Sequence, residues 1–264
     1  MTSGPRSGLP SFRLDNRLAI VTGASEGLGR AFALAFAEAG ARIVLSSRRR
    51  EKLEEVQRQI EAIGGTADVV PADMARLDDI KALAAAIGRL EHGEGLVLVN
   101  NAGLGHTRPA LDTTEEEWDR LIDVHLKGTF FCCREIAPLM IARGYGKIVN
   151  LSSTWAQTSD IGKAAYGAAK AGISRLTAAL STEWAPHGVR VNALAPTATL
   201  THSTSSSMTN NPERAQRMLA HIRLGRFAEP RDIVGPALFL ASEASDFVTG
   251  HTLFVDGGWT AGSF

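Results

Sequence analysis

The feature that most constrains this chain is an alternation, from Leu18 onward, of short β-branched runs with Ala-rich amphipathic stretches. This alternation is typical of βαβ units that build a parallel sheet. The β-branched runs predict seven strands, at residues 18–21, 42–46, 67–70, 96–99, 147–151, 190–193 and 252–255. Apolar residues three and four positions apart predict helices at 29–39, 50–63, 77–90, 115–142 and 164–184. We therefore expect an α/β fold with a doubly wound parallel sheet, whose ligands bind beyond the carboxyl ends of the strands.

Length places these elements in one unit. A chain of 264 residues can bury a substantial core without support from disulfides or metals. We expect residues 17–264 to form a single domain and residues 1–16 to be a flexible N-terminal arm. The stretch 197–212 consists almost entirely of Ser, Thr, Asn and Ala and is longer than ordinary connections. It is interpreted either as a mobile lid over the substrate or as a disordered surface loop.

A glycine-rich turn directly follows the first predicted strand. It reads Thr-Gly-Ala-Ser-Glu-Gly-Leu-Gly over residues 22–29 and leads into an Ala-rich helix. Glycines in such a turn let the backbone approach a pyrophosphate, and the helix N-terminus offers free amide hydrogens and a positive dipole end. The position between a strand and a helix indicates a Rossmann-type dinucleotide site rather than a turn whose glycines only relieve strain. The candidate contacts are Gly23, Ser25, Gly27, Leu28 and Gly29.

The end of the second predicted strand favours one of the two nicotinamide dinucleotides. It reads Ser-Ser-Arg-Arg-Arg over residues 46–50, where the adenosine ribose is expected. A carboxylate there would accept hydrogen bonds from both ribose hydroxyls and repel a 2′-phosphate, whereas Ser and Arg do the opposite. Ser47, Arg48 and Arg49 therefore favour NADP(H), with NAD(H) as the alternative. Glu26 in the glycine-rich turn opposes this preference.

Three side chains form a candidate acid/base group. Tyr166 and Lys170 are four positions apart in a predicted helix, so both project from one face. A free tyrosine has a pKa of about 10, and a nearby ammonium together with an oxidised nicotinamide ring would favour its phenolate. Lowering that pKa to about 7 requires roughly 4 kcal/mol, within reach of two close positive charges. Ser153, at the end of the fifth predicted strand, can hydrogen-bond a substrate oxygen in the same crevice.

At these positions the sequence resembles the short-chain dehydrogenase/reductase family in its single-domain form of about 250 residues. The resemblance covers residues 12–258 and includes the turn at 22–29, Asp73 after the third strand, and Asn-Asn-Ala-Gly at 100–103. Tyr166 follows Ser153 by thirteen positions, as the family pattern requires. The resemblance implies that Ser153, Tyr166 and Lys170 are catalytic, that Lys170 also donates to the nicotinamide ribose, and that the cofactor carries the hydride.

The resemblance implies further cofactor contacts and two departures. Asp73 and Met74 would border the adenine, Asn101, Ala102 and Gly103 the nicotinamide ribose, and Pro196, Thr199 and Thr201 the carboxamide. His125 stands where the family usually has an asparagine that organises a water leading protons away from the lysine. Histidine titrates near neutrality, so His125 can serve that relay itself, or it can simply fill the space in its helix. Thr197 stands where the family commonly has a glycine after the proline.

Composition restricts the partners. The 28 basic and 28 acidic residues give no field that would attract nucleic acid or an anionic membrane. The apolar runs are too short to span a bilayer, and no secretory signal is recognised, so we expect a cytoplasmic protein. Cys132 and Cys133 are adjacent and poorly placed to bridge each other, which fits free thiols in a reducing compartment. The seven histidines show no metal-ligand spacing, so no metal is expected.

The sequence therefore predicts an NADP-preferring enzyme that interconverts a ketone and a secondary alcohol. Polyols, keto-sugar acids and 3-oxoacyl compounds are the candidate substrates. The alternative is a cofactor-binding scaffold or sensor of the same fold with negligible turnover. Residues 154–163, the stretch 197–212 and Met208 are expected to shape the substrate pocket, and Trp155, Gln157 and many hydroxyls lean towards polar substrates. The resemblance implies a homotetramer, with a dimer as the fallback, and apolar positions on helices 115–142 and 164–184 beyond what one sheet face can cover agree with this.

Overall fold

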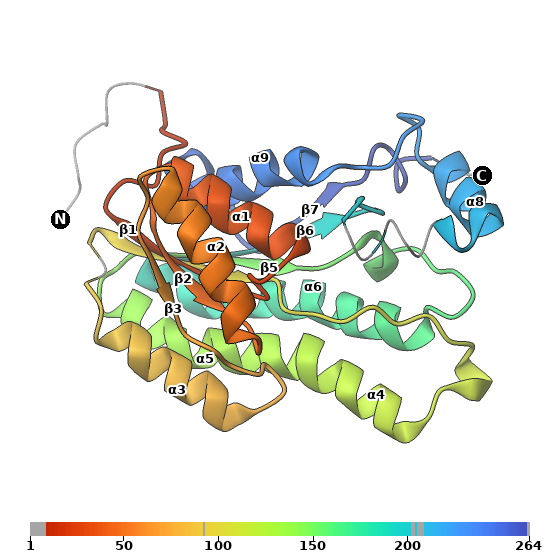
Figure 1. Ribbon diagram of the computed structural model, residues 1–264, viewed down its shortest axis with the longest axis horizontal. Coiled ribbons are helices and arrows are strands. Elements are labelled where there is room, and N and C mark those ends of the chain that lie inside the picture. Colours follow the sequence, from red (N-terminus) through yellow and green to blue (C-terminus); the bar gives the residue numbers. More distant parts are fainter. Residues whose placement is uncertain (1–8, 92, 202–203, 205–208, 263–264) are drawn as a thin grey trace.

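The computed structural model describes residues 9–91, 93–201, 204 and 209–262. Its centre is a seven-stranded parallel sheet with the order β3-β2-β1-β4-β5-β6-β7 (Figure 1). The strands are β1 (Arg17–Thr22), β2 (Arg42–Ser46), β3 (Ala67–Val69), β4 (Gly95–Asn100), β5 (Gly146–Leu151), β6 (Val189–Pro196) and β7 (Thr252–Val255). The seven predicted strands are all present, and the expected α/β fold class is confirmed.

The strand order reverses at β1. Ile20 of β1 pairs with Val44 of β2 on one side and with Leu98 of β4 on the other. The chain therefore leaves β1 towards one edge of the sheet and returns to build the other half from β4 onward. At such a reversal the connections diverge and leave a crevice beyond the carboxyl ends of the two central strands.

Helices cover both faces of the sheet. In Figure 1, α1 (Gly27–Glu38), α2 (Arg50–Ala62) and α9 (Pro230–Ala241) lie on one side, and α3 (Leu77–Gly88), α5 (Gly128–Ile141) and α6 (Ala164–Trp184) lie on the other. Two further helices, α4 (Glu115–Ile122) and α8 (Pro212–His221), extend past the end of the sheet in the same view. Short 3-10 turns occur at Ala110–Asp112, Thr154–Ala156, Ala185–His187 and Glu243–Ser245.

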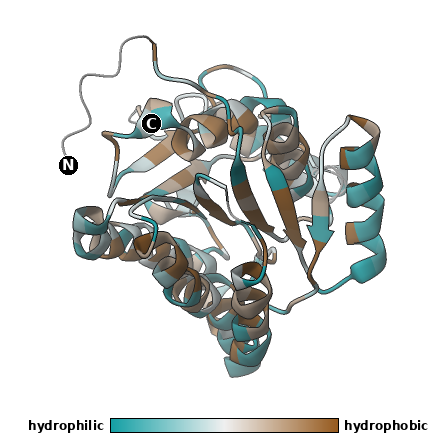
Figure 2. Cartoon of the chain, turned by 90° about the vertical axis from the view of Figure 1, so that its left-hand side faces the viewer, coloured by the Kyte–Doolittle hydropathy of each residue, from teal (hydrophilic) through white to brown (hydrophobic). Residues whose placement is uncertain are grey.

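The core consists of two apolar layers separated by the sheet. Alternate residues of the central strands, such as Val97 and Leu98, belong to opposite layers because side chains in a strand alternate between faces. One layer packs against α1 through Phe32, and the other against α5 through Ile136. Figure 2 shows the same division, with hydrophobic strands between helices whose outer sides are hydrophilic. Strands covered on both faces explain why the sequence runs are continuously apolar.

Some sequence expectations differ from the structure. The helix expected over 115–142 is interrupted by a π-helical turn, Asp123–Lys127, between α4 and α5. Helices α8 and α9 lie outside the expected helices, and α9 contains Pro236, which obscures its periodicity. Within the segment expected to be a flexible arm, Leu14 is fully buried and its amide donates to Ala39 O at 2.8 Å. Among the described residues, no helix combines the length and apolar character needed to cross a membrane.

Candidate functional site

The glycine-rich turn links β1 to α1 and packs tightly against the segment after β4. Gly23 and Gly27 have φ angles of +66° and +57°, which side chains other than glycine rarely adopt. A Cβ on Gly29 would lie 2.2 Å from Gly23 O, so only glycine fits there. The Thr22 hydroxyl accepts hydrogen bonds from the amides of Asn101 and Ala102, both at 3.1 Å. The turn and residues 101–103 therefore form one rigid floor.

The N-terminus of α1 opens onto this floor without a side-chain cap. Its N-cap residue, Glu26, makes no capping hydrogen bond, so the first amide hydrogens of α1 keep their capacity to donate. Close backbone approach, left-handed glycines and free amides fit the pyrophosphate of a dinucleotide.

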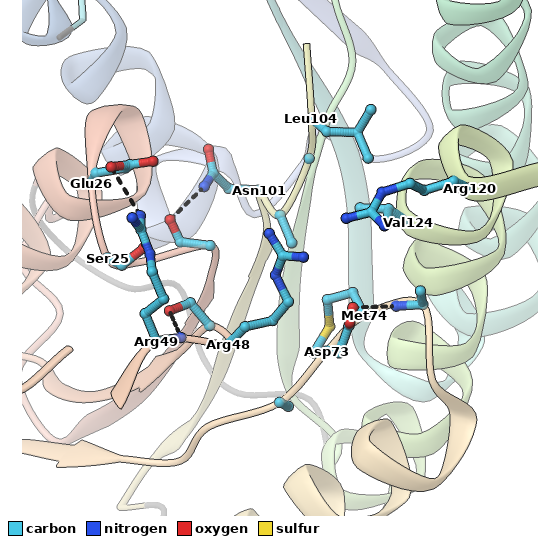
Figure 3. A pocket seen from close by; sticks show the side chains of 16 residues that line it. Ser25, Glu26, Arg48, Arg49, Asp73, Met74, Asn101, Leu104, Arg120 and Val124 are labelled. Atoms are coloured by element: carbon cyan, nitrogen blue, oxygen red, sulfur yellow. Dashed lines mark hydrogen bonds and ion pairs between the residues drawn. The ribbon is translucent and has the colours of Figure 1, made fainter. Parts of the chain in front are cut away.

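A cavity of about 270 Å³ lies beside this turn and contains the predicted adenosine contacts. It is lined by Gly23, Ser25, Ser47, Arg48, Arg49, Asp73, Met74, Asn101, Ala102 and Gly103, together with Arg120 and others. Figure 3 shows that Arg48 and Arg120, from β2's end and from α4, point towards each other across it. Arg120 was not predicted, because its proximity depends on the packing of α4 and no local motif marks it.

Charges in this cavity resolve the conflict posed by Glu26. The Arg49 guanidinium pairs with the Glu26 carboxylate at 2.9 Å, and both side chains are more than half exposed. The acidic residue of the turn is therefore neutralised by one of the three arginines, and Arg48 and Arg120 add positive charge to the same cavity. Asp73 accepts from the Ala75 amide at 3.0 Å and shapes the backbone there. The cavity as a whole fits an anionic ligand.

Ser153, Tyr166 and Lys170 come together at the carboxyl end of β5. Ser153 follows β5 and caps the 3-10 turn Thr154–Ala156, and its side chain is near enough to Tyr166 to affect the pKa of the phenol. Tyr166 and Lys170 project from α6, and Lys170 Nζ lies 5.6 Å from the centre of the Tyr166 ring. The Lys170 ammonium donates to Leu151 O at 2.6 Å, which ties α6 to β5.

Burial controls the protonation of this group. It raises the pKa of Tyr166 to about 12, against the opposing effect of the nearby Ser153 hydroxyl. It also lowers the pKa of Lys170 to about 7. In the polypeptide alone, desolvation therefore sets the protonation of the phenol, and the lowering of its pKa by Lys170 together with an oxidised nicotinamide ring stays a prediction.

His125 lies in the π-helical turn and packs edge-on against Tyr166, with ring centroids 5.4 Å apart. Its Nε2 is 3.1 Å from the Leu104 amide nitrogen and 2.9 Å from the Leu104 carbonyl oxygen. Burial, assisted by the charge of Lys170, lowers the pKa of His125 to about 3, so the ring is neutral near pH 7. Of the two expectations for His125, a neutral buried ring favours the one in which it fills the space in its helix. A Cβ on Gly103 would lie 2.5 Å from the ring, which shows how completely His125 fills its space.

A second cavity, of about 610 Å³, contains the acid/base group and adjoins the glycine-rich turn. Its lining includes the predicted residues Gly27, Leu28, Asn101, Gly103, His125, Ser153, Trp155, Tyr166, Lys170, Pro196, Thr197, Thr199 and Thr201. Of the stretch 197–212, expected to be either a lid or a disordered surface loop, Asn211 caps α8, and Met208 lies outside the described residues.

The larger cavity also has lining residues that were not predicted. Among them are His106 and Thr107 after β4, and Arg214, Ala215 and Met218 on α8. Lys163, before α6, also lines the cavity and belongs to the range 154–163 that was expected to shape it. The Asn-Pro-Glu sequence at 211–213 is a helix-start signal that would have located α8. Nothing local would have shown that α8 closes the cavity.

Comparison with known proteins agrees with this geometry. A family model described as enoyl-(acyl carrier protein) reductase matches residues 23–260. The 2-dehydro-3-deoxy-D-gluconate 5-dehydrogenase of Escherichia coli is 38% identical over 255 residues, covering 96% of this chain and 99% of the relative. The 3-oxoacyl-(acyl-carrier-protein) reductase of Staphylococcus aureus is 37% identical, covering 91% of this chain and 96% of the relative.

A crystal structure supports the same assignment. The gluconate 5-dehydrogenase of Burkholderia cenocepacia, solved with NADP and tartrate, superposes with a TM-score of 0.90 at 35% identity, covering 96% of this chain and 98% of that one. The chain belongs to the short-chain dehydrogenase/reductase family. As a member of that family it is a nicotinamide-dependent oxidoreductase, and the enzyme class expected from the sequence is confirmed. In this short-chain dehydrogenase/reductase, the two cavities meet at Asn101 and Gly103, beyond the ends of β1 and β4.

Proposed function

We propose that this enzyme interconverts a secondary alcohol and a ketone on a small, polar, acidic substrate of the keto-sugar acid type, with NADP(H) as the preferred cofactor. The observation that carries this proposal is that Ser153, Tyr166 and Lys170 line one cavity, which adjoins the glycine-rich turn. Two relatives act on sugar acids by their names, the dehydrogenases of Escherichia coli and Burkholderia cenocepacia. The polar lining of this cavity supports the same class of substrate.

The side chains have distinct roles in this proposal. When bound, the nicotinamide ring supplies or accepts the hydride. In reduction, the Tyr166 hydroxyl donates its proton to the substrate oxygen, and Ser153 donates a hydrogen bond to the same oxygen. Lys170 holds positive charge beside the phenol and anchors α6 on β5 through Leu151. His125 positions Tyr166 by packing against its ring.

Substitution of Tyr166 tests the proposal most directly. Tyr166→Phe removes the proton donor and keeps the ring that packs on His125, so turnover should fall by about 10²- to 10⁴-fold. The variant should still bind NADPH, as measured by the rise in its melting temperature on addition of the cofactor. Retained turnover would contradict the mechanism. A wild-type protein that binds NADPH but oxidises it with no ketone of a broad panel would support the scaffold or sensor alternative instead.

The NADP preference rests on the charges of the smaller cavity. Ser47 and Arg48 follow β2, and no carboxylate stands at their positions to bind the ribose hydroxyls. NADP should raise the melting temperature more than NAD at equal concentration, because a ligand stabilises the native state more the tighter it binds. Arg48→Asp should reverse the order of the two cofactors. Stronger protection of the wild type by NAD would contradict this interpretation.

The contacts of the cofactor are also part of this proposal. The turn residues 23–29 hold the pyrophosphate, Asp73 and Met74 border the adenine, residues 101–103 border the nicotinamide ribose, and Pro196, Thr199 and Thr201 border the carboxamide.

A cytoplasmic homotetramer built from one domain per chain, residues 17–264, completes the proposal. Trp118 on α4 and Phe130 on α5 are exposed large apolar side chains, which supports burial of these helices between subunits. Size-exclusion chromatography with light scattering should give four chains per particle, or two in the fallback case. A monomer at micromolar concentration would refute the assembly.

A further inference from the structure

We propose that Lys163 and Arg214 form the site that binds a carboxylate of the substrate. This inference rests on the proposed function, because it takes the larger cavity as the substrate site, and it adds the residues that select an acid over a neutral ketone. Both side chains line that cavity, one from the segment before α6 and the other from the first turn of α8. Neither has a role in the proton transfer proposed above.

Lys163 is a buried ammonium held by neutral groups only. The residue is 9% exposed, and its Nζ donates to His106 O and to Thr107 Oγ1, both at 2.6 Å. An ammonium has three N–H donors, so one donor remains for a ligand. These two bonds also fix the Nζ position, which preorganises it for binding.

Arg214 adds a second charge at the same place. Its guanidinium is close enough to Lys163 that, after burial, it is the main cause that lowers the lysine pKa to about 8, while Asp160 has the opposite, smaller effect. Lys163 therefore remains a cation at neutral pH despite its burial. Two cations that repel each other across a cavity cost free energy that an anion between them would offset.

The charges of these two residues have no partner within the described ranges. Neither Lys163 nor Arg214 lies within ion-pair distance of a carboxylate there, and no side chain outside those ranges is acidic. Glu26, the acidic residue among the described lining of this cavity, pairs with Arg49 at 2.9 Å. Lys163 is buried and Arg214 is half-buried; since buried charges are normally paired, the missing partner of Lys163 is a ligand.

The position of the two cations sets the size of the substrate. Lys163 Nζ lies 5.2 Å from the centre of the Tyr166 ring, next to the proposed proton donor. A carboxylate held there places the reacting carbon only a few bonds from the acid group, as in a short hydroxy or keto acid. His106 lines the same cavity, and its two ring nitrogens have no hydrogen-bond partner among the described residues, so it can serve the hydroxyls of such a compound.

The test compares an acidic and a neutral ketone of similar size, 5-ketogluconate and fructose, as substrates for NADPH oxidation. Arg214→Gln should raise KM for the acid by about 10- to 100-fold, the usual effect of losing one charge-assisted hydrogen bond, and leave kcat/KM for fructose within about twofold. Lys163→Gln should act in the same direction, and Arg214→Lys should recover part of the loss. Arg217→Gln, on the exposed side of α8, is the matched control.

A binding measurement separates failure of this inference from failure of the proposed function. In the presence of NADP, tartrate should raise the melting temperature of the wild type more than threitol, its neutral counterpart, and Arg214→Gln should abolish the difference whether or not turnover is detected. Equal KM changes for acid and neutral ketone, or no change for either, would overturn the carboxylate site. A 3-oxoacyl thioester of a carrier protein, whose phosphate is also anionic, is the third substrate to assay. If Arg214→Gln lost activity only towards this thioester, the carboxylate site would be overturned as well.

Discussion

The buried lysine of α6, Lys170, should make the stability of this protein depend on pH in a defined way. Burial lowers the pKa of Lys170 from 10.5 to about 7. At a pH where the lysine is charged in both the folded and the unfolded chain, this shift lowers the free energy of unfolding by about 5 kcal/mol. Between pH 7 and pH 10.5 the unfolded chain binds a proton that the folded chain has released, so stability rises with pH. Integrated from pH 6 to pH 9, the gain is roughly 2.6 kcal/mol. The pKa of Tyr166, about 12, lies above this range.

Lys170→Met removes this cost while keeping the length of the side chain. The variant should lose turnover and be more stable than the wild type at pH 6, and its advantage should shrink by about 2–3 kcal/mol at pH 9. Loss of the hydrogen bond to Leu151 changes the free energy of unfolding of the variant equally at pH 6 and at pH 9, so it cancels when the two pH values are compared. Urea unfolding of both proteins at equal concentration and at the two pH values measures the difference. Lys81→Met, at an exposed position, is the control and should follow the wild type at both pH values.

A stability difference between wild type and Lys170→Met that stays constant from pH 6 to pH 9 would refute this reasoning. A difference that widens with pH would refute it too, because it would mean that the fold stabilises the charged lysine.

Three further predictions follow from single contacts. Gly29→Ala places a methyl group 2.2 Å from Gly23 O, so it should destabilise the fold by about 1–3 kcal/mol and remove the thermal shift caused by NADP. His125→Asn should leave the pH profile of kcat/KM unchanged between pH 5 and pH 9, since the imidazole is neutral throughout that range; a profile that loses a step would show a titrating histidine. Cys132 and Cys133 are fully buried and burial raises the pKa of both thiols, so Ellman's reagent should label neither in the native protein and both in guanidinium, whereas fast native labelling would contradict their burial.

The sheet could be predicted from sequence because each of its strands is encoded locally. Residues 96–99 are a continuous apolar run, and the strand they form is buried on both faces between two helical layers. The acid/base group could also be predicted, since Tyr166 and Lys170 share one helix and Ser153 follows β5. Strand β5 pairs with β4, which in turn pairs with β1, the strand that precedes the glycine-rich turn. Local periodicity and spacing were sufficient for these elements.

The remaining parts of the site depend on contacts between distant segments. Arg120 and Arg214 reach their cavities because α4 and α8 extend past the sheet, and neither residue stands in a motif. The π-helical turn around His125 contains one residue more than an α-helical turn. The apolar pattern continues in the helices on both sides of it, so periodicity alone predicted one uninterrupted helix. Pairing of Glu26 with Arg49 likewise joins the glycine-rich turn to the end of β2.

The proton balance of the site follows from desolvation, which the sequence does not display. Burial raises the pKa of Tyr166 and so keeps it a neutral phenol in the polypeptide alone, the form that would donate a proton in the proposed reduction. Oxidation requires the phenolate, and the positive charge that favours it must come from Lys170 and from an oxidised nicotinamide. Because the pKa of Lys170 is about 7, the lysine contributes that charge fully only below neutrality, and the share demanded of the nicotinamide grows as the pH rises.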